Sequence, residues 1–223
     1  TDLQRVGYAE SRSFSSSPEL DFGVAGPTVA ASHRAPWSPE FDGRRLRIGA
    51  DPIDLGGIGK GLAVRWAMAE LEGHGAGVLV DAGGDLMTMG CSPEGGPWHI
   101  GVENPWASDA EPLVVLEARD AAVATSAIRL RSWVNSGLTV HHLIDPRTGE
   151  PGGAGLVSVS VIGADAADAE VWSKALFLEG IAGIAAAAKQ HGLAAIWIDA
   201  SGAVDMTEAA ASRSIWQVSH ASR

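Results

Sequence analysis

Apolar residues recur at a helical spacing early in the chain. The apolar face is made by Ile58, Leu62, Trp66 and Leu71. Positions about one helical turn apart are typical of an amphipathic helix, and the glycines at 73 and 75 are typical of its end. The pattern therefore predicts a helix that follows a glycine-rich turn at 56–61.

Short apolar runs between turn residues predict strands elsewhere. They lie at 44–49, at 76–90 as two strands around a glycine turn, and at 97–105, 112–118 and 155–163. Two hairpins are predicted at 127–145, around Asn135-Ser136-Gly137, and at 193–207, around Ser201-Gly202. Helical spacing returns at 164–180 and 181–192. Because strands and helices are mixed without strict alternation, the order favours an α+β fold.

Residues 1–223 are predicted to form a single domain with an irregular N-terminal segment. That segment, 1–43, is rich in Ser, Gly and Pro and shows little periodicity, so it is interpreted as mostly loop with one short helix or strand at most.

Composition narrows the classes of partner. Lysine and arginine total 16 against 27 acidic residues, a net charge of −11, so no basic surface for nucleic acid is expected. No run of eighteen apolar residues occurs, and the chain is not expected to be integral to a membrane. The single cysteine, Cys91, excludes an internal disulfide and a thiolate metal cluster. The eight tryptophans are expected in the core and in pocket walls.

The first glycine turn carries one lysine at the start of the predicted helix. Such a turn suits an anion, since backbone N–H groups and the helix dipole favour negative charge. The phosphate-binding P-loop pattern does not fit, because Asp54 stands where it needs glycine and Gly61 follows Lys60 where it needs Ser or Thr. The dinucleotide fingerprint G-x-G-x-x-G does not fit either. A plain strand-to-helix turn is the alternative interpretation.

Two more glycine turns carry polar side chains. One lies between Asp81 and Asp85, and the other follows His142, where Asp145 and Arg147 add a carboxylate and a guanidinium. A structural Asp-Pro turn with a solvated arginine is the alternative for the second. His141 and His142 point to opposite faces of a strand, so at most one of them can face a given pocket.

These turns, taken in order, resemble motifs of the FAD:protein FMN transferases, the ApbE-like proteins. "DLGGIGKGLA" is similar to the family's D-L-G-G-I-x-K-G-Y-A, "LVDAGGDL" to N-x-G-G-D/N, "ATSA" to A-T-S-G, and "HHLIDPRTGEP" to H-x-I-D-P-R-T-G-x-P. The resemblance implies an α+β fold, related to the T-fold, of mixed sheets with packed helices and FAD in a cleft between lobes. It also implies that the irregular segment 1–43 is shortened relative to the family.

The implied reaction cleaves FAD, transfers FMN to a threonine of a partner flavoprotein and releases AMP. Magnesium on the diphosphate would neutralise charge in this reaction. Catalytic residues implied are Lys60, His142, Asp145, Glu170 and Lys174. Cofactor-binding residues implied are Asp54, Gly56, Gly57, Lys60, Thr125, Ser126, Ala127, His142, Leu143, Ile144 and Asp145. Metal ligands implied are Gly57, through its carbonyl, and Glu170.

One departure concerns the metal. The family carries D-x-x-x-T on the later helix, whereas this chain has Glu170 and Lys174 at those places. Residues four apart share a helix face, so the two can form an ion pair. An ammonium there would repel a divalent ion by on the order of several kcal/mol at an effective dielectric near 20. We therefore hypothesise that Lys174 stands in for the metal, an exposed ion pair without a role being the alternative.

Other functions stay open at this point. A flavin-binding protein without catalysis and an FAD pyrophosphatase with an altered metal site are the alternatives to transfer. The resemblance also suggests a place outside the cytoplasmic membrane, although this chain shows no signal peptide and no lipobox at Cys91.

Overall fold

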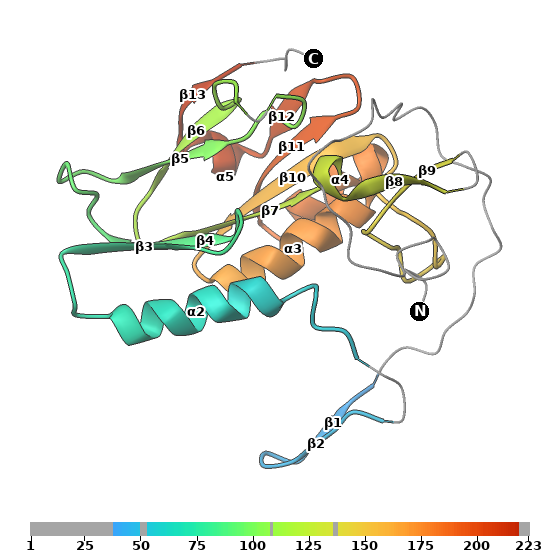
Figure 1. The fold of residues 1–223 in the computed structure, drawn as a ribbon, viewed down its shortest axis with the longest axis horizontal. Coiled ribbons are helices and arrows are strands. Elements are labelled where there is room, and N and C mark those ends of the chain that lie inside the picture. The colour runs from blue at the N-terminus through green and yellow to red at the C-terminus, as the bar shows by residue number, and fades with distance from the viewer. Residues whose placement is uncertain (1–37, 50–52, 108, 136–137, 219–223) are drawn as a thin grey trace.

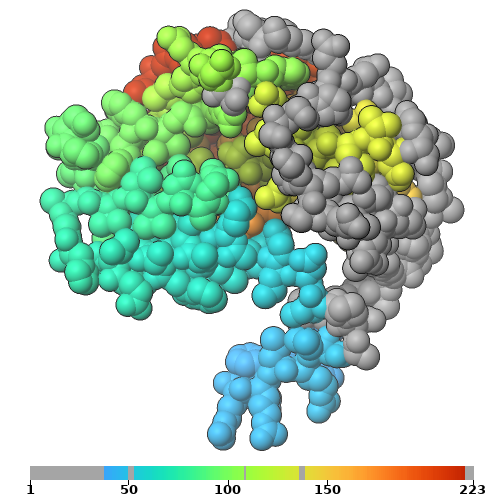
Figure 2. Space-filling view, in the orientation of Figure 1, coloured from blue at the N-terminus to red at the C-terminus, as the bar shows by residue number. Residues whose placement is uncertain are grey.

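The computed structural model describes residues 38–49, 53–107, 109–135 and 138–218 (Figure 1 and Figure 2). The helices are α2 (Gly59–Leu71), α3 (Ala166–Leu178), α4 (Gly180–Gln190) and α5 (Glu208–Ala211), with a 3-10 turn η1 at Arg129–Arg131. The strands are β1 (Glu40–Phe41), β2 (Leu46–Arg47), β3 (Gly77–Asp81), β4 (Leu86–Gly90), β5 (Trp98–Val102), β6 (Val114–Ala118), β7 (Ala122–Ala127), β8 (Ser132–Asn135), β9 (Leu138–His141), β10 (Leu156–Gly163), β11 (Ala194–Asp199), β12 (Val204–Met206) and β13 (Ser214–Gln217). The predicted α+β class is confirmed.

A six-stranded sheet organises the fold. Its strand order is β12-β11-β10-β7-β4-β3, and every pairing between described strands is antiparallel. Helices α2 and α3 pack on one face (Figure 1). The three-stranded sheet β13-β6-β5 covers the other face.

Alternation along the strands explains why both faces are covered. In β10, Val159 and Val161 belong to the helix-side core while Ile162 belongs to the core under the three-stranded sheet. In β11, Trp197 faces the helices and Ile198 the other sheet. Because successive side chains of a strand point to opposite faces, apolar residues at both parities require two covering layers.

The helices α2 and α3 meet closely at Gly61. A Cβ added there would lie 2.6 Å from Cα of Ala167, so only glycine lets the two backbones approach this far. The side chain of Arg65 on α2 also pairs with Asp165, the N-cap of α3, with Nε 2.6 Å from Oδ2. These contacts fix the start of α2 against α3.

The position of the first predicted helix is confirmed, but its predicted apolar face is wrong. The buried residues of α2 are Gly61, Val64 and Met68. Trp66 is 63% exposed and Leu71 39% exposed, so they do not line the core. The close approach to α3 sets the orientation of the helix, and small Gly61 lies where the larger apolar side chains would not fit. Trp133 and Trp197 are buried, as expected for tryptophans in the core, whereas the exposure of Trp66 and Trp216 contradicts that expectation.

Two further differences concern strands. The first strand of the hairpin predicted at 127–145 is shorter than expected, because the turn η1 precedes it and β8 begins only at Ser132. The residues before η1 form β7, which was not predicted. Helix α5 and strand β13 were not predicted either. The strands at 76–90, 97–105, 112–118, 155–163 and 193–207 and the helices at 164–180 and 181–192 are confirmed.

The prediction that residues 1–37 are mostly loop falls outside the described residues. At the end of the segment 1–43, strand β1 pairs with β2, and β2 lies within the strand predicted at 44–49. No helix among the described residues has the length and apolarity needed to cross a membrane.

Candidate active site

The first glycine turn leads directly into α2. The side chain of Asp54 accepts the N–H of Gly56 at 2.7 Å, and the carbonyl of Leu55 accepts the N–H of Gly59 at 2.8 Å. Ile58, which stands at the N-cap, makes no side-chain capping bond. The predicted site residue Asp54 therefore shapes the turn, and the N-terminal N–H groups of α2 need partners from elsewhere.

Lys60 joins the first glycine turn to the second. Its Nζ lies 2.7 Å from Asp85 Oδ2 as an ion pair, without hydrogen-bond geometry at that oxygen, and 3.5 Å from the carbonyl oxygen of Gly83. The Asp85 side chain is 1% exposed and that of Lys60 is 38% exposed. The lysine is therefore anchored at a buried carboxylate while part of it still meets solvent.

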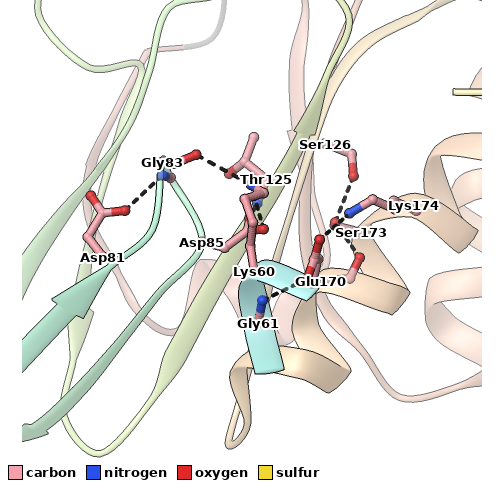
Figure 3. A network of polar contacts seen from close by, with 11 residues as sticks. Lys60, Gly61, Asp81, Gly83, Asp85, Thr125, Ser126, Glu170, Ser173 and Lys174 are labelled. Carbon is pink, nitrogen blue, oxygen red and sulfur yellow. Dashed lines mark hydrogen bonds and ion pairs between the residues drawn. The ribbon is translucent and has the colours of Figure 1, made fainter. Parts of the chain in front are cut away.

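Asp85 also fixes the edge of β7. Its Oδ1 accepts the N–H of Thr125 at 3.2 Å (Figure 3). The Thr125 hydroxyl lies 2.8 Å from that of Ser160 on β10. The predicted residues Thr125 to Ala127 thus end β7 beside the second glycine turn. Sequence reasoning did not include Asp85 among the site residues, although it ends the glycine turn that had been singled out.

Glu170 and Lys174 form the predicted ion pair on α3. Lys174 Nζ lies 2.9 Å from Glu170 Oε1, and the Glu170 side chain has 0% exposure. The other oxygen, Oε2, accepts the N–H of Gly61 at 2.7 Å (Figure 3). A buried carboxylate is thus shared between an ammonium and the start of α2.

A short chain of hydroxyls continues from this pair. Ser173 donates to the carbonyl of Glu170 at 2.9 Å, and the hydroxyls of Ser173 and Ser126 lie 2.8 Å apart. Ser126, another predicted site residue, is therefore tied to α3. Ser173 and Gly61 were not predicted as site residues, because their partners are remote in sequence.

The residues do not fit a divalent metal ion as they lie. Within the described ranges no group of three or more His, Cys, Asp and Glu side chains could hold one. Both oxygens of Glu170 are engaged, and the stem of Lys174 runs beside Gly57, where an added Cβ would lie 3.8 Å from the lysine Cδ. The ammonium thus holds the carboxylate that the ion would need.

His142 follows β9 and stays neutral. Burial is the main cause that lowers its pKa to about 3, with further lowering by the charges of Arg131, His141 and Lys174. Its backbone N–H donates to the carbonyl of Arg131 at 3.3 Å, while its Nδ1 is buried without a hydrogen-bond partner in the part of the chain described. A neutral imidazole near positive charge can still bond a polar ligand.

The neighbouring His141 is a core residue. Burial lowers its pKa to about 4, its Nδ1 accepts the N–H of Leu143, and its ring meets Phe177 edge to face at 5.9 Å. Leu143 is also buried, and Ile144 makes a bridge with Pro151. The two histidines therefore do have different surroundings.

Asp145 organises its own turn. Its Oδ1 accepts the backbone N–H of Arg147 at 2.8 Å, and the guanidinium Nε lies 3.0 Å from both carboxylate oxygens. Burial raises the pKa of Asp145, but the bonds from Arg147 outweigh burial and hold the pKa below its usual value. Arg147 also donates to the carbonyl of Leu178 at 2.9 Å, which ties the turn to the end of α3. Among the described residues, no bond joins Asp145 to Lys60 or Glu170.

The site thus carries one ammonium group on each of the two helices that meet at Gly61. Lys60 comes from α2 and Lys174 from α3, and each rests on a buried carboxylate. Fixed cations and backbone N–H groups suit an anionic ligand such as a phosphate.

Comparison with known proteins supports the resemblance to the ApbE-like proteins. The model of the ApbE family matches residues 37–197. The FAD:protein FMN transferase of Treponema pallidum is 30% identical over 165 residues, which is 70% of this chain and 43% of that protein. The chain therefore spans less than half the length of this curated relative.

Solved structures agree on the fold. The crystal structure of the ApbE protein from Thermotoga maritima matches with a TM-score of 0.70 and 32% sequence identity. The match covers 78% of this chain and 58% of the Thermotoga chain. The apo form of the flavinyl transferase ApbE of Pseudomonas stutzeri matches with a TM-score of 0.69 and 29% sequence identity, over 81% of this chain and 57% of the Pseudomonas chain. On the extent of the family match and the shared fold, this chain belongs to the ApbE family.

Proposed function

We propose that this protein binds FAD at the turns that carry Lys60 and Lys174 and transfers the FMN part to a threonine of a partner flavoprotein. The threonine oxygen would attack the FMN phosphorus as the bond to the bridging oxygen breaks. AMP leaves with that oxygen, and the proton of the hydroxyl is released. One phosphoester forms for each diphosphate bond that is cleaved.

One observation carries this proposal: Lys60 and Lys174 lie on two helices that meet at the glycine turn, each on a buried carboxylate. Cleavage of a diphosphate depends on neutralising charge and aligning the attacking group more than on covalent catalysis. Two positioned ammonium groups suit that demand. The relatives named as FAD:protein FMN transferases make FAD the substrate to test first.

The remaining expected site residues take supporting roles in this proposal. His142 would meet the ligand through its unpartnered Nδ1. Asp145 would hold the turn whose backbone, from His142 to Asp145, lines the nucleotide pocket together with the backbone of Thr125 to Ala127. Asp54, Gly56 and Gly57 would shape the turn near the phosphates. Magnesium has no part in these steps, because the carboxylate proposed for it is occupied.

The test is incubation with FAD and a purified flavoprotein domain that bears an acceptor threonine. Release of AMP together with a gain of one FMN mass on the acceptor would support transfer. The matched controls are the acceptor with valine in place of that threonine and the Lys60→Met protein. AMP with free FMN and an unmodified acceptor would indicate hydrolysis instead, and FAD binding without AMP would indicate a carrier.

A further inference from the structure

We infer that Lys174 is the resident cation of this site, so that the nucleotide diphosphate binds without a divalent metal ion. The ammonium would donate to a phosphate oxygen while Glu170 holds it in place. The part of this inference that concerns FAD rests on the proposed function. The part that concerns metal exclusion does not.

The carboxylate of Glu170 leaves no place for an ion. Its Oε1 receives Lys174 Nζ at 2.9 Å, and its Oε2 receives the backbone N–H of Gly61 at 2.7 Å. The side chain has 0% exposure, so water cannot replace either partner. A divalent ion could bind this carboxylate only by displacing an ammonium that is already paired or by lying close to its positive charge.

The ammonium remains available to a ligand. Lys174 is 23% exposed, and an ammonium has three N–H donors, of which one is directed to Glu170. Its stem passes Gly57 in the first glycine turn, and its charge contributes to the low pKa of His142. The donors that have no partner among the described residues therefore lie among groups from the first turn, from α3 and from the segment after β9.

The charge balance fits a metal-free site. The pair Glu170 and Lys174 is neutral, and the pair Lys60 and Asp85 is neutral as well. The two ammonium groups would then neutralise phosphate charge locally, through N–H donors directed at its oxygens, while the two ion pairs as a whole carry no net charge. Such a site needs no extra ion to assemble before the nucleotide arrives.

Metal exclusion is tested on the protein alone. Manganese binding to the wild-type chain is measured by electron paramagnetic resonance without nucleotide, with Glu170→Gln as the matched variant. The expected result is no stoichiometric manganese in either protein. One manganese per chain that Glu170→Gln abolishes would overturn the inference.

Nucleotide binding is tested by titrating FAD and following flavin fluorescence, in excess EDTA and in excess MgCl2. The wild-type affinity is expected to be the same in both buffers. Lys174→Gln, which can still bond Glu170, should bind FAD at least about tenfold more weakly in EDTA, since it loses a hydrogen bond to a charged group. Lys189→Gln, an exposed lysine in the last turn of α4, is the matched control and should bind as the wild type does.

The outcomes separate the two proposals. Tighter binding of FAD by the wild type in MgCl2, or full affinity of Lys174→Gln in EDTA, would overturn Lys174 as the resident cation while FAD remained the ligand. A wild-type protein that binds no FAD in either buffer would overturn the proposed function, and the manganese measurement would still decide metal exclusion. The wild-type measurements need no variant, so they hold even if Lys174→Gln is unstable.

Discussion

The backbone N–H of Gly61 donates to Glu170 Oε2 over 2.7 Å, so a carboxylate in the middle of α3 caps the first turn of α2. The N-cap residue of α2, Ile58, has no side-chain oxygen to do this. A negative charge at a helix N-terminus is also favoured by the helix dipole. The candidate site is therefore built on a contact that holds two helices together.

Gly61→Ala should destabilise the protein by about 1–3 kcal/mol, the range for overpacking a tight contact. The added Cβ would lie 2.6 Å from Cα of Ala167, and backbone cannot move aside as a side chain can. The free energy of unfolding in urea checks this. Gly59→Ala is the control, because nothing lies within 4 Å of its added Cβ, and it should be neutral or stabilising. Equal effects of the two substitutions would contradict the close contact.

Lys60→Met should cost about 1–3 kcal/mol of stability, since it leaves the Asp85 carboxylate buried without its cation. Adding Asp85→Asn should recover much of the loss, because the amide oxygen can still accept the N–H of Thr125. A thermodynamic cycle of the two single variants and the double variant measures this. Strictly additive losses would show that the ion pair contributes nothing.

Arg147→Lys keeps the charge but should lower stability by about 0.5–1 kcal/mol, the upper part of the range for a side chain that is 59% exposed. The guanidinium binds both oxygens of Asp145 and the carbonyl of Leu178, and an ammonium cannot reproduce this fork. Arg47→Lys is the matched control: its pair with Glu40 is exposed, at 80% and 73%, and should matter by less than about 0.5 kcal/mol. A loss as small for Arg147→Lys as for the control would contradict the role of the fork.

Stability should rise with pH between about 5 and 6.5 because of the two neighbouring histidines. Burial lowers the pKa of His141 to about 4 and that of His142 to about 3, below the ordinary 6.5 that the unfolded chain has. The unfolded state therefore takes up protons first as pH falls. The stabilisation is fully present above pH 6.5 and is lost progressively toward the folded pKa values.

Urea unfolding at several pH values checks this dependence. His142→Gln should reduce the slope of the unfolding free energy against pH in that window, which lies above the range where carboxyl groups titrate. Phosphate at the site should also raise the pKa of His142, since an anion favours imidazolium. The pKa of His142 would be read from the imidazole chemical shifts at several pH values, with and without ADP. A pKa that ADP leaves unchanged would place the anion elsewhere.

The positions of most helices and strands could be predicted from the sequence, because apolar runs and glycine turns mark where these elements begin and end. The face of α2 was not predictable from spacing, since Trp66 and Leu71 have the apolar character of core residues. What turns Val64 and Met68 inward is the approach of α3 at Gly61, a contact between segments more than a hundred positions apart. Strand β7 was missed because four of its six residues are alanine or serine, which are weak strand formers.

The candidate site was predictable where its contacts are local. The i,i+4 spacing predicted the pair of Glu170 and Lys174, and the structure confirms that contact. The partners of Lys60 and Ser126 come from other elements, so neither Asp85 nor Ser173 could be identified from spacing.

The double engagement of Glu170 sets a constraint on protein engineering and on evolution alike. Redirecting this carboxylate to an ion would free an amide inside the interface between α2 and α3, so a gain of metal chemistry would loosen the scaffold that presents it. A metal-dependent descendant would first need a new acceptor for Gly61 or extra stability elsewhere. The present pairing is thus easier to keep than to exchange in a single step.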